Sequence, residues 1–258
     1  MKHSFTLSKL IPRPGLLGSA LAALALLAIA ASSSSAQVLP PSSLPYGLSY
    51  QEWSAKWWQS YYSQSADHLQ PVTSPNICEG PASRVLFLAG APQSTTTTNH
   101  VTIPAGSPLF FAILGFEADN TSCPTNTFTT NSADVLANEA VNGWDSAATE
   151  TSCTIDGVAV PGLGSPTNTI YNVVSPPFSY TTAEKDNVAA VAEGEPCLPG
   201  GLTVYPTVAD GVYLMLAPLP PGKHTIHFIG EAGPGGADLT INITYDITVL
   251  RDFSCGGF

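Results

Sequence analysis

The chain has 258 residues, 19 of them acidic and eight basic, and its formal net charge at pH 7 is −11. All of the acidic residues but only five of the basic ones follow Ala36, so residues 37–258 carry a formal charge of −14. A chain of this sign repels phosphate backbones and anionic lipid, which argues against nucleic acid as a partner.

The first 36 residues have the pattern of a signal peptide. Three basic residues precede an apolar stretch, Leu16–Ala31, which runs into small residues up to Ala36. At about 16 residues this stretch is shorter than the roughly 20 that a membrane-spanning helix needs. We therefore expect a secreted or periplasmic protein without membrane insertion, in which residues 37–258 form a single domain.

A helix is predicted soon after the signal peptide. Ser49 and Glu52 have the spacing of an N-terminal capping box. At about 100° per residue, the large aromatic residues that follow fall mostly on one face, and the polar residues on the other. A second helix is predicted over 133–147, where Leu136, Ala140 and Trp144 share a stripe.

The remaining segments are predicted to be mainly strands. Residues 238–249 alternate between apolar and polar side chains, which is typical of an antiparallel strand with one wet face. Residues 85–89, 109–114 and 212–217 are apolar on both faces, which indicates interior strands. Asp156-Gly157 is a two-residue hairpin signal. We expect an all-β fold: a two-layer antiparallel, jelly-roll-like β-sandwich with an N-terminal amphipathic helix and a second helix packed against it.

Five cysteines are candidates for disulfide bonds in an oxidising compartment. No C-x-x-C pair suggests a zinc or redox site, and two disulfides with one remaining thiol is the simplest arrangement. Cys255, near the C-terminus, is the candidate for the odd thiol. The five are Cys78, Cys123, Cys153, Cys197 and Cys255.

The standard signatures of nucleophilic and metal-dependent enzymes are missing from the sequence, including G-x-S-x-G and H-E-x-x-H. His224 and His227 are three residues apart, so on a strand they point to opposite faces and do not share one metal ion. We therefore predict no cofactor and no metal centre, with a bound Ca²⁺ ion as the one alternative.

Paired carboxylates are the best candidate for catalysis. Glu117 and Asp119 share one face where the apolar strand that starts at Leu109 ends, beside Asn120. They could act as acid and base in a carbohydrate-active hydrolase or lyase, or bind Ca²⁺ together with the Asn120 carbonyl. The alternative is a solvated loop.

A second acidic group brackets a later apolar run. We interpret it as a charged rim without a chemical role; its members are Glu184, Asp186, Glu193 and Glu195.

Aromatic residues of the first helix offer a binding hypothesis. Trp58 and Tyr62 lie beyond one edge of its main aromatic face and could stack on a sugar ring, whereas Trp53 and Trp57 are expected to be core. Core packing is the alternative for Trp58 and Tyr62 as well.

Several short motifs occur in order along most of the chain after the signal peptide. They are Glu52-Trp53 with Trp57-Trp58, Ile103-Pro104-Ala105-Gly106, and Pro218-Leu219-Pro220-Pro221-Gly222-Lys223-His224. Together they resemble a family of secreted bacterial proteins that has no assigned function, so the resemblance implies export and adds no activity.

Three functions remain open from the sequence. The first is a non-catalytic secreted protein that binds a glycan or a cell-envelope partner. The second is a carbohydrate-active enzyme that uses Glu117 and Asp119, and the third is a purely structural protein of the cell surface.

Overall fold

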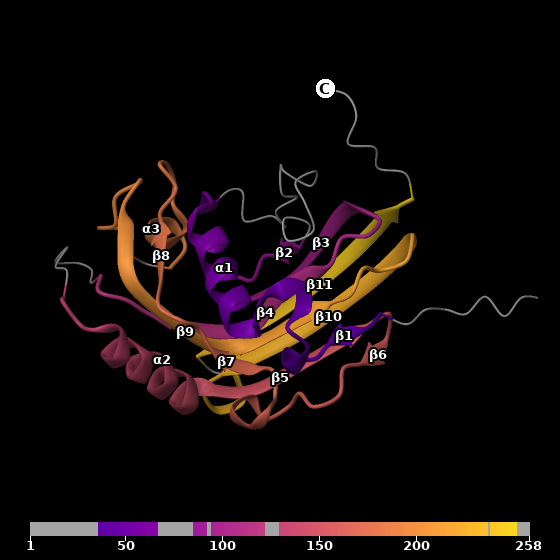
Figure 1. The fold of residues 1–258 in the computed structure, drawn as a ribbon, viewed down its shortest axis with the longest axis horizontal. Helices are drawn as coiled ribbons and strands as arrows, with labels where there is room; N and C mark the ends of the chain where they lie inside the picture. Colours follow the sequence, from indigo (N-terminus) through magenta and orange to yellow (C-terminus); the bar gives the residue numbers. More distant parts are fainter. Residues whose placement is uncertain are drawn as a thin grey trace, which may run out of the picture. The chain divides into compact units, whose positions relative to one another are not determined.

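A computed structural model of the protein describes residues 36–66, 85–91, 94–121, 129–193, 195–236 and 238–251. All of them fall within one compact unit of the chain, residues 35–258. Two β-sheets pack together, and helix α1 (Tyr50–Tyr62) crosses one of them at β4 (Figure 1). The β-sandwich predicted from the sequence, with helices packed against it, is confirmed.

The first sheet is organised around a long central strand, β9 (Thr203–Leu216). Strand β4 (Leu109–Ala118) pairs along one edge of β9, and three shorter strands pair along the other. These shorter strands are β1 (Val38–Leu39), β7 (Asn172–Val174) and β8 (Phe178–Thr181), while β2 (Leu86–Leu88) extends the sheet beyond β4. Strands β2 and β4 run parallel, and the other pairs are antiparallel.

The second sheet has the strand order β3-β11-β10-β5-β6. The strands span Thr95–Pro104, Leu239–Leu250, Gly222–Ala232, Ala148–Ile155 and Val158–Ala159 in that order. Strand β3 is parallel to β11, so the expected antiparallel pairing holds for all described pairs except this one and β2–β4. Strands joined by a short hairpin must run antiparallel, whereas these two pairs join segments that no hairpin connects.

The alternation in β11 places one row of side chains in the core and the other outside. Ile241, Ile243 and Tyr245 are buried, and between the sheets Phe111 of β4 stacks on Phe228 of β10 with ring centroids 5.2 Å apart. Residues 109–114 of β4 are buried throughout, because α1 covers the face of β4 that the second sheet leaves free. The sequence prediction of an interior strand is confirmed here.

Helix α1 begins at the predicted capping box. The Glu52 backbone N–H donates to Ser49 Oγ at 3.2 Å, and the Ser49 backbone N–H donates to the Glu52 carboxylate at 2.7 Å. Its aromatic face packs on the sheet, where Tyr50 meets Phe110 edge-on at 5.7 Å. The Trp57 indole N–H donates to the Leu88 carbonyl at 2.9 Å, which fixes the helix over β2.

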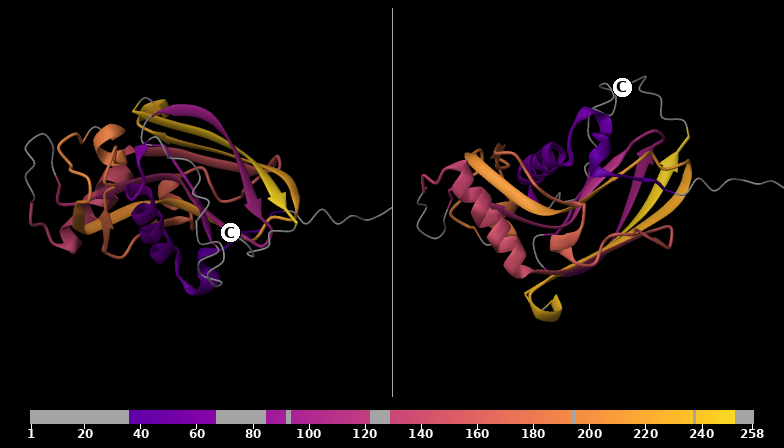
Figure 2. Two further views of the ribbon diagram at one scale, coloured as in Figure 1. Left: turned by 90° about the horizontal axis from the view of Figure 1, so that it is seen from above. Right: turned by 60° about the horizontal axis from the view of Figure 1, so that its bottom comes forward.

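Helix α2 (Ala133–Ala147) has the bounds predicted from the sequence and leads directly into β5 (Figure 2). Its Leu136 and Ala140 pack on Ala118 of β4 and on β9. Because successive side chains of a strand alternate between faces, Phe116 and Ala118 face α2. Glu117 and Asp119 therefore face the opposite side, toward the C-terminal end of α1.

Cys153 corrects one disulfide prediction. It is a free, buried thiol on β5, and burial raises its pKa to about 12, so it stays protonated and unreactive at neutral pH. Cys197 is not free. Cys78, Cys123 and Cys255 lie outside the described residues, so the pairing of the cysteines stays a prediction.

In the part of the chain that the structure describes, no helix is both long and apolar enough to cross a bilayer.

Candidate functional site

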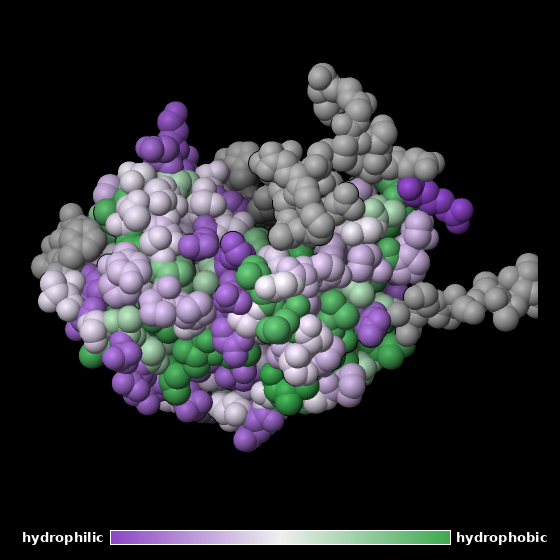
Figure 3. Space-filling model, in the orientation of Figure 1, coloured by the Kyte–Doolittle hydropathy of each residue, from purple (hydrophilic) through white to green (hydrophobic). Residues whose placement is uncertain are grey.

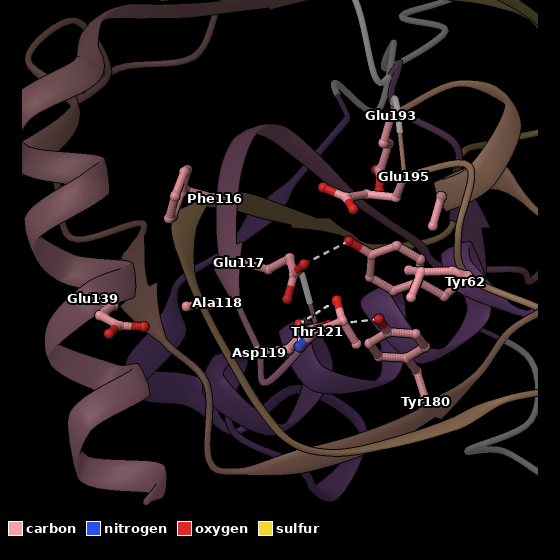
Figure 4. A pocket seen from close by; sticks show the side chains of 12 residues that line it. Tyr62, Phe116, Glu117, Ala118, Asp119, Thr121, Glu139, Tyr180, Glu193 and Glu195 are labelled. Atoms are coloured by element: carbon pink, nitrogen blue, oxygen red, sulfur yellow. Dashed lines mark hydrogen bonds between the residues drawn. The ribbon is translucent and has the colours of Figure 1, made fainter. Parts of the chain in front are cut away.

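A cavity of about 300 Å³, which we call the acid pocket, lies where β4 ends. It is bounded by the last turn of α1, by β8 and by the segment that follows the short helix α3 (Val188–Val191). Five carboxyl groups, two tyrosines and one threonine supply its polar lining: Glu117, Asp119, Glu139, Glu193, Glu195, Tyr62, Tyr180 and Thr121. Figure 4 shows Glu117, Glu193 and Glu195 gathered around the Tyr62 hydroxyl, with Glu139 apart on α2.

Glu117 is the most perturbed acid of the acid pocket. The Tyr62 hydroxyl donates to its Oε1 at 2.9 Å, while its Oε2 is buried without a partner among the described residues. Burial raises the pKa of Glu117 well above its ordinary value, the charge of Asp119 adds to the rise, and the hydrogen bond from Tyr62 opposes it. Glu117 therefore holds its proton to a higher pH than an ordinary glutamate.

Asp119 is held in place by donors from two segments. The Tyr180 hydroxyl donates to its Oδ2 at 2.5 Å, and the backbone N–H and hydroxyl of Thr121 both donate to its Oδ1, at 2.6 and 2.7 Å. Tyr180 in turn stacks on Tyr62 with ring centroids 4.1 Å apart. Both acids are thus fixed by tyrosines that pack on each other.

Glu193 and Glu195 are two further acids that line the acid pocket. Burial raises the pKa of Glu193, and a hydrogen bond from the Tyr61 hydroxyl opposes that rise. The Oε2 atom of Glu195 is buried, and none of the described groups hydrogen-bonds it. The sequence interpretation of these two glutamates as a charged rim is corrected, because both line the acid pocket.

The sequence indicates only weakly that Glu193 and Glu195 line the acid pocket. The two residues are two positions apart after α3, but the pairing of β8 with β9 and the contact of α3 with α1 bring them to Glu117. Glu184 and Asp186 of the same predicted rim do not line the acid pocket.

The two proposed aromatic ligand-binding residues have different positions. Tyr62 lines the acid pocket, together with Glu117 and Asp119. Trp58 is only 7% exposed, and its indole N–H donates to the Tyr213 hydroxyl at 2.7 Å. It lines a neighbouring aromatic pocket of about 110 Å³, together with Trp57, Tyr61 and the shared Glu193.

The geometry gives little support to a Ca²⁺ site at Asn120. Its side-chain oxygen already accepts from Thr129 and Asn131, and its backbone carbonyl accepts from the Thr129 N–H. Among the described residues, no three or more acidic, histidine or cysteine side chains are grouped to hold a metal ion. His224 and His227 bind separate partners, Asp156 at 2.7 Å and Asn242 at 2.9 Å.

The arrangement can do two things chemically. Carboxylate oxygens with unused acceptor capacity can receive hydrogen bonds from a ligand, and a protonated Glu117 beside other carboxyl groups can donate a proton. Comparison with known proteins gives no further guide to the function, because no family model, no curated protein and no solved structure matches this chain.

Proposed function

We propose that this protein is a secreted or periplasmic, non-catalytic protein that binds a glycan or another cell-envelope component in the acid pocket. The observation that carries the proposal is the convergence of carboxyl groups, tyrosines and Thr121 on one cavity in which Glu117 and Glu195 keep unused acceptors. A sugar ring is dense in hydroxyl donors, which such acceptors bind. The predicted signal peptide and the resemblance to secreted bacterial proteins support the location.

The neighbouring aromatic pocket adds to the argument for a glycan. It shares Glu193 with the acid pocket, so aromatic walls and carboxylates lie side by side. Sites for small molecules combine apolar walls with a few polar groups in this way. On the face that Figure 3 shows, the apolar residues drawn in green lie in separate small groups among polar ones.

Calorimetric titration with a panel of oligosaccharides tests the proposal. We expect saturable binding that Glu195→Gln weakens by about tenfold, the effect of losing one hydrogen bond to a charged group. Glu150→Gln is the matched control, because Glu150 is exposed on β5 outside the acid pocket. Equal binding by the two variants, or no binding by the folded wild type, contradicts the proposal. Trp58→Ala is a poor probe, because the ring is buried.

A carbohydrate-active hydrolase or lyase is the second candidate. It is favoured by the raised pKa of Glu117, since a general acid must keep its proton at the working pH. Asp119, with three donors on its carboxylate, would be a well-oriented partner. This candidate requires release of reducing ends from some polysaccharide and loss of that release in Glu117→Gln. If neither binding nor turnover is found, a structural role at the cell surface remains.

A further inference from the structure

The acid pocket holds negative charge without a positive partner. Its lining contains five carboxyl groups, and none of the described residues that line it is a lysine, arginine or histidine. The whole chain has the same imbalance, with a formal net charge of −11. Burial is the main cause of the raised pKa values of Glu117 and Glu193, and the charges of neighbouring acids, Asp119 among them, add to both rises.

Unsatisfied acceptors point to a missing donor. The Oε2 atoms of Glu117 and Glu195 are both buried, and no described residue hydrogen-bonds either of them. Buried polar atoms in native proteins nearly always have a partner, so two such oxygens at one cavity can receive hydrogen bonds from a group that enters it. A hydrogen-bond donor satisfies both oxygens when the two carboxyl groups are ionised, because a carboxylate oxygen accepts hydrogen bonds.

A metal ion fits this geometry poorly. Ca²⁺ takes six to eight oxygen ligands, yet the described acids are not grouped to hold an ion, and three donors already occupy Asp119. A primary ammonium group needs fewer oxygen partners than Ca²⁺ does. It brings three N–H donors and one positive charge on a flexible stem. It can bind two carboxylates without a closed coordination shell.

A neutral sugar complements the acid pocket less well than an ammonium group does. Hydroxyl groups can donate to the two free oxygens, but they leave the repulsion among the carboxylates in place. A positive charge about 4 Å from a carboxylate gains several times more Coulomb energy near a protein surface than in bulk water. A cavity of about 300 Å³ has the volume of about ten water molecules, which is comparable with one sugar residue.

We propose that the acid pocket recognises an amino sugar, whose protonated amine lies between Glu117 and Glu195. This inference rests on the proposed function, because it names the class of glycan that the same pocket binds. Binding then favours the ionised form of the acids, so the protein releases protons when the amine enters. A neutral glycan leaves this protonation nearly unchanged.

Titration with three tetrasaccharides separates this inference from the proposed function. We expect the glucosamine oligomer to bind the full secreted protein at pH 7 at least ten times more tightly than the N-acetylglucosamine and cellulose oligomers. Glu195→Gln should lose most of that preference, while Glu150→Gln, which removes the same charge elsewhere on the surface, should keep it. The control excludes general attraction of a cation to an acidic protein.

Proton release is the second readout and needs no variant. Calorimetry of wild-type protein at pH 5.5, where the free amine already carries its proton, in two buffers with different ionisation enthalpies, should report protons released by the carboxyl groups with the glucosamine oligomer and almost none with a neutral one. If the acetylated or neutral oligomer binds as tightly as the glucosamine oligomer, or if no protons are released, the amino-sugar inference is wrong and glycan binding stands. If no oligomer binds the folded protein, both proposals fail.

Discussion

Asp210 is a buried acid that does not line the acid pocket, and its surroundings make its charge unfavourable. It lies on β9 between β4 and β7, is 2% exposed, and has no hydrogen-bond partner for Oδ1 among the described residues. Burial raises its pKa from 3.8 to about 7, and the charge of Asp145 on α2 adds to the rise. The folded chain therefore binds a proton at Asp210 that the unfolded chain releases near pH 4.

The sign of the resulting pH dependence follows from this raised pKa. Protonated Asp210 stabilises the fold fully below about pH 4, and that contribution is lost as the pH rises to about 7. We expect Asp210→Asn, which carries no charge at any pH, to be more stable than wild type at pH 8 by about 1–3 kcal/mol, because the substitution removes a charge whose burial is unfavourable.

Urea unfolding at pH 4 and pH 8 measures this difference. The advantage of Asp210→Asn should be present at pH 8 and should shrink or reverse at pH 4. Glu150→Gln, on the exposed surface of β5, should show no such pH-dependent advantage. An equal advantage at both pH values would mean that the charge of Asp210 has no part in it.

At the scale of elements, the two sheets lie in close contact at Gly230, where β10 packs on β4. A Cβ atom added to Gly230 would lie 2.7 Å from the Ile113 carbonyl oxygen and 2.8 Å from the Leu114 Cβ. The register of β4 against β9 shifts between Ala112 and Leu114, at the same place. Glycine at position 230 thus permits the contact between the layers.

Gly230→Ala should destabilise the protein by about 1–3 kcal/mol, the usual cost of overpacking a core. Gly90→Ala is the control, because its added Cβ would be 3.5 Å from the Trp57 ring, an ordinary contact. Thermal unfolding of both variants by circular dichroism checks the prediction. A Gly230→Ala protein as stable as Gly90→Ala would show that the sheets can separate without cost.

Elements that depend on local pattern were predictable from the sequence, and their assembly was not. The capping box at Ser49 defines the start of α1, and the stripe through Leu136 and Ala140 defines α2, because a few neighbouring residues determine each helix. The parallel pairs β2–β4 and β3–β11 depend on contacts between segments that are distant in the sequence. The alternation of apolar and polar residues within one strand does not show which strand it pairs with.

The acid pocket was predictable in part for the same reason. Glu117 and Asp119 share a face of β4 because of the two-residue period of a strand, which is visible in the sequence. Tyr180, Glu193 and Glu195 reach the acid pocket only through the packing of β8 and of the segment after α3. That packing is not visible in the sequence. Whether Trp58 is buried or exposed could not be predicted, because the periodicity of a helix does not show how much of its surface other elements cover.

At the scale of the whole molecule, several buried acids shift stability in the same direction. Burial raises the pKa of Glu117, Glu193 and Asp210. Each is stabilising while protonated, so stability is highest below the ordinary glutamate and aspartate pKa values and falls as the pH rises through the raised ones. The net negative charge, which grows with pH, acts in the same direction through self-repulsion.

We therefore expect the protein to be more stable toward urea at pH 5 than at pH 8. The midpoint of unfolding, followed by tryptophan fluorescence at the two pH values, measures this. Glu117→Gln should narrow the difference between the two midpoints. A higher midpoint at pH 8 in the wild-type protein would show that the buried acids do not control its pH dependence.

We propose the acid pocket as the place where this protein binds its ligand. The most direct test is a titration of ¹⁵N-labelled protein with the glucosamine tetrasaccharide, followed through backbone amide shifts. We predict that the amides of Thr121, Glu193 and Glu195 shift together and saturate. Shifts confined to the outer groove of the second sheet, at His100 and Asp246, or no saturable shift at all, would contradict it.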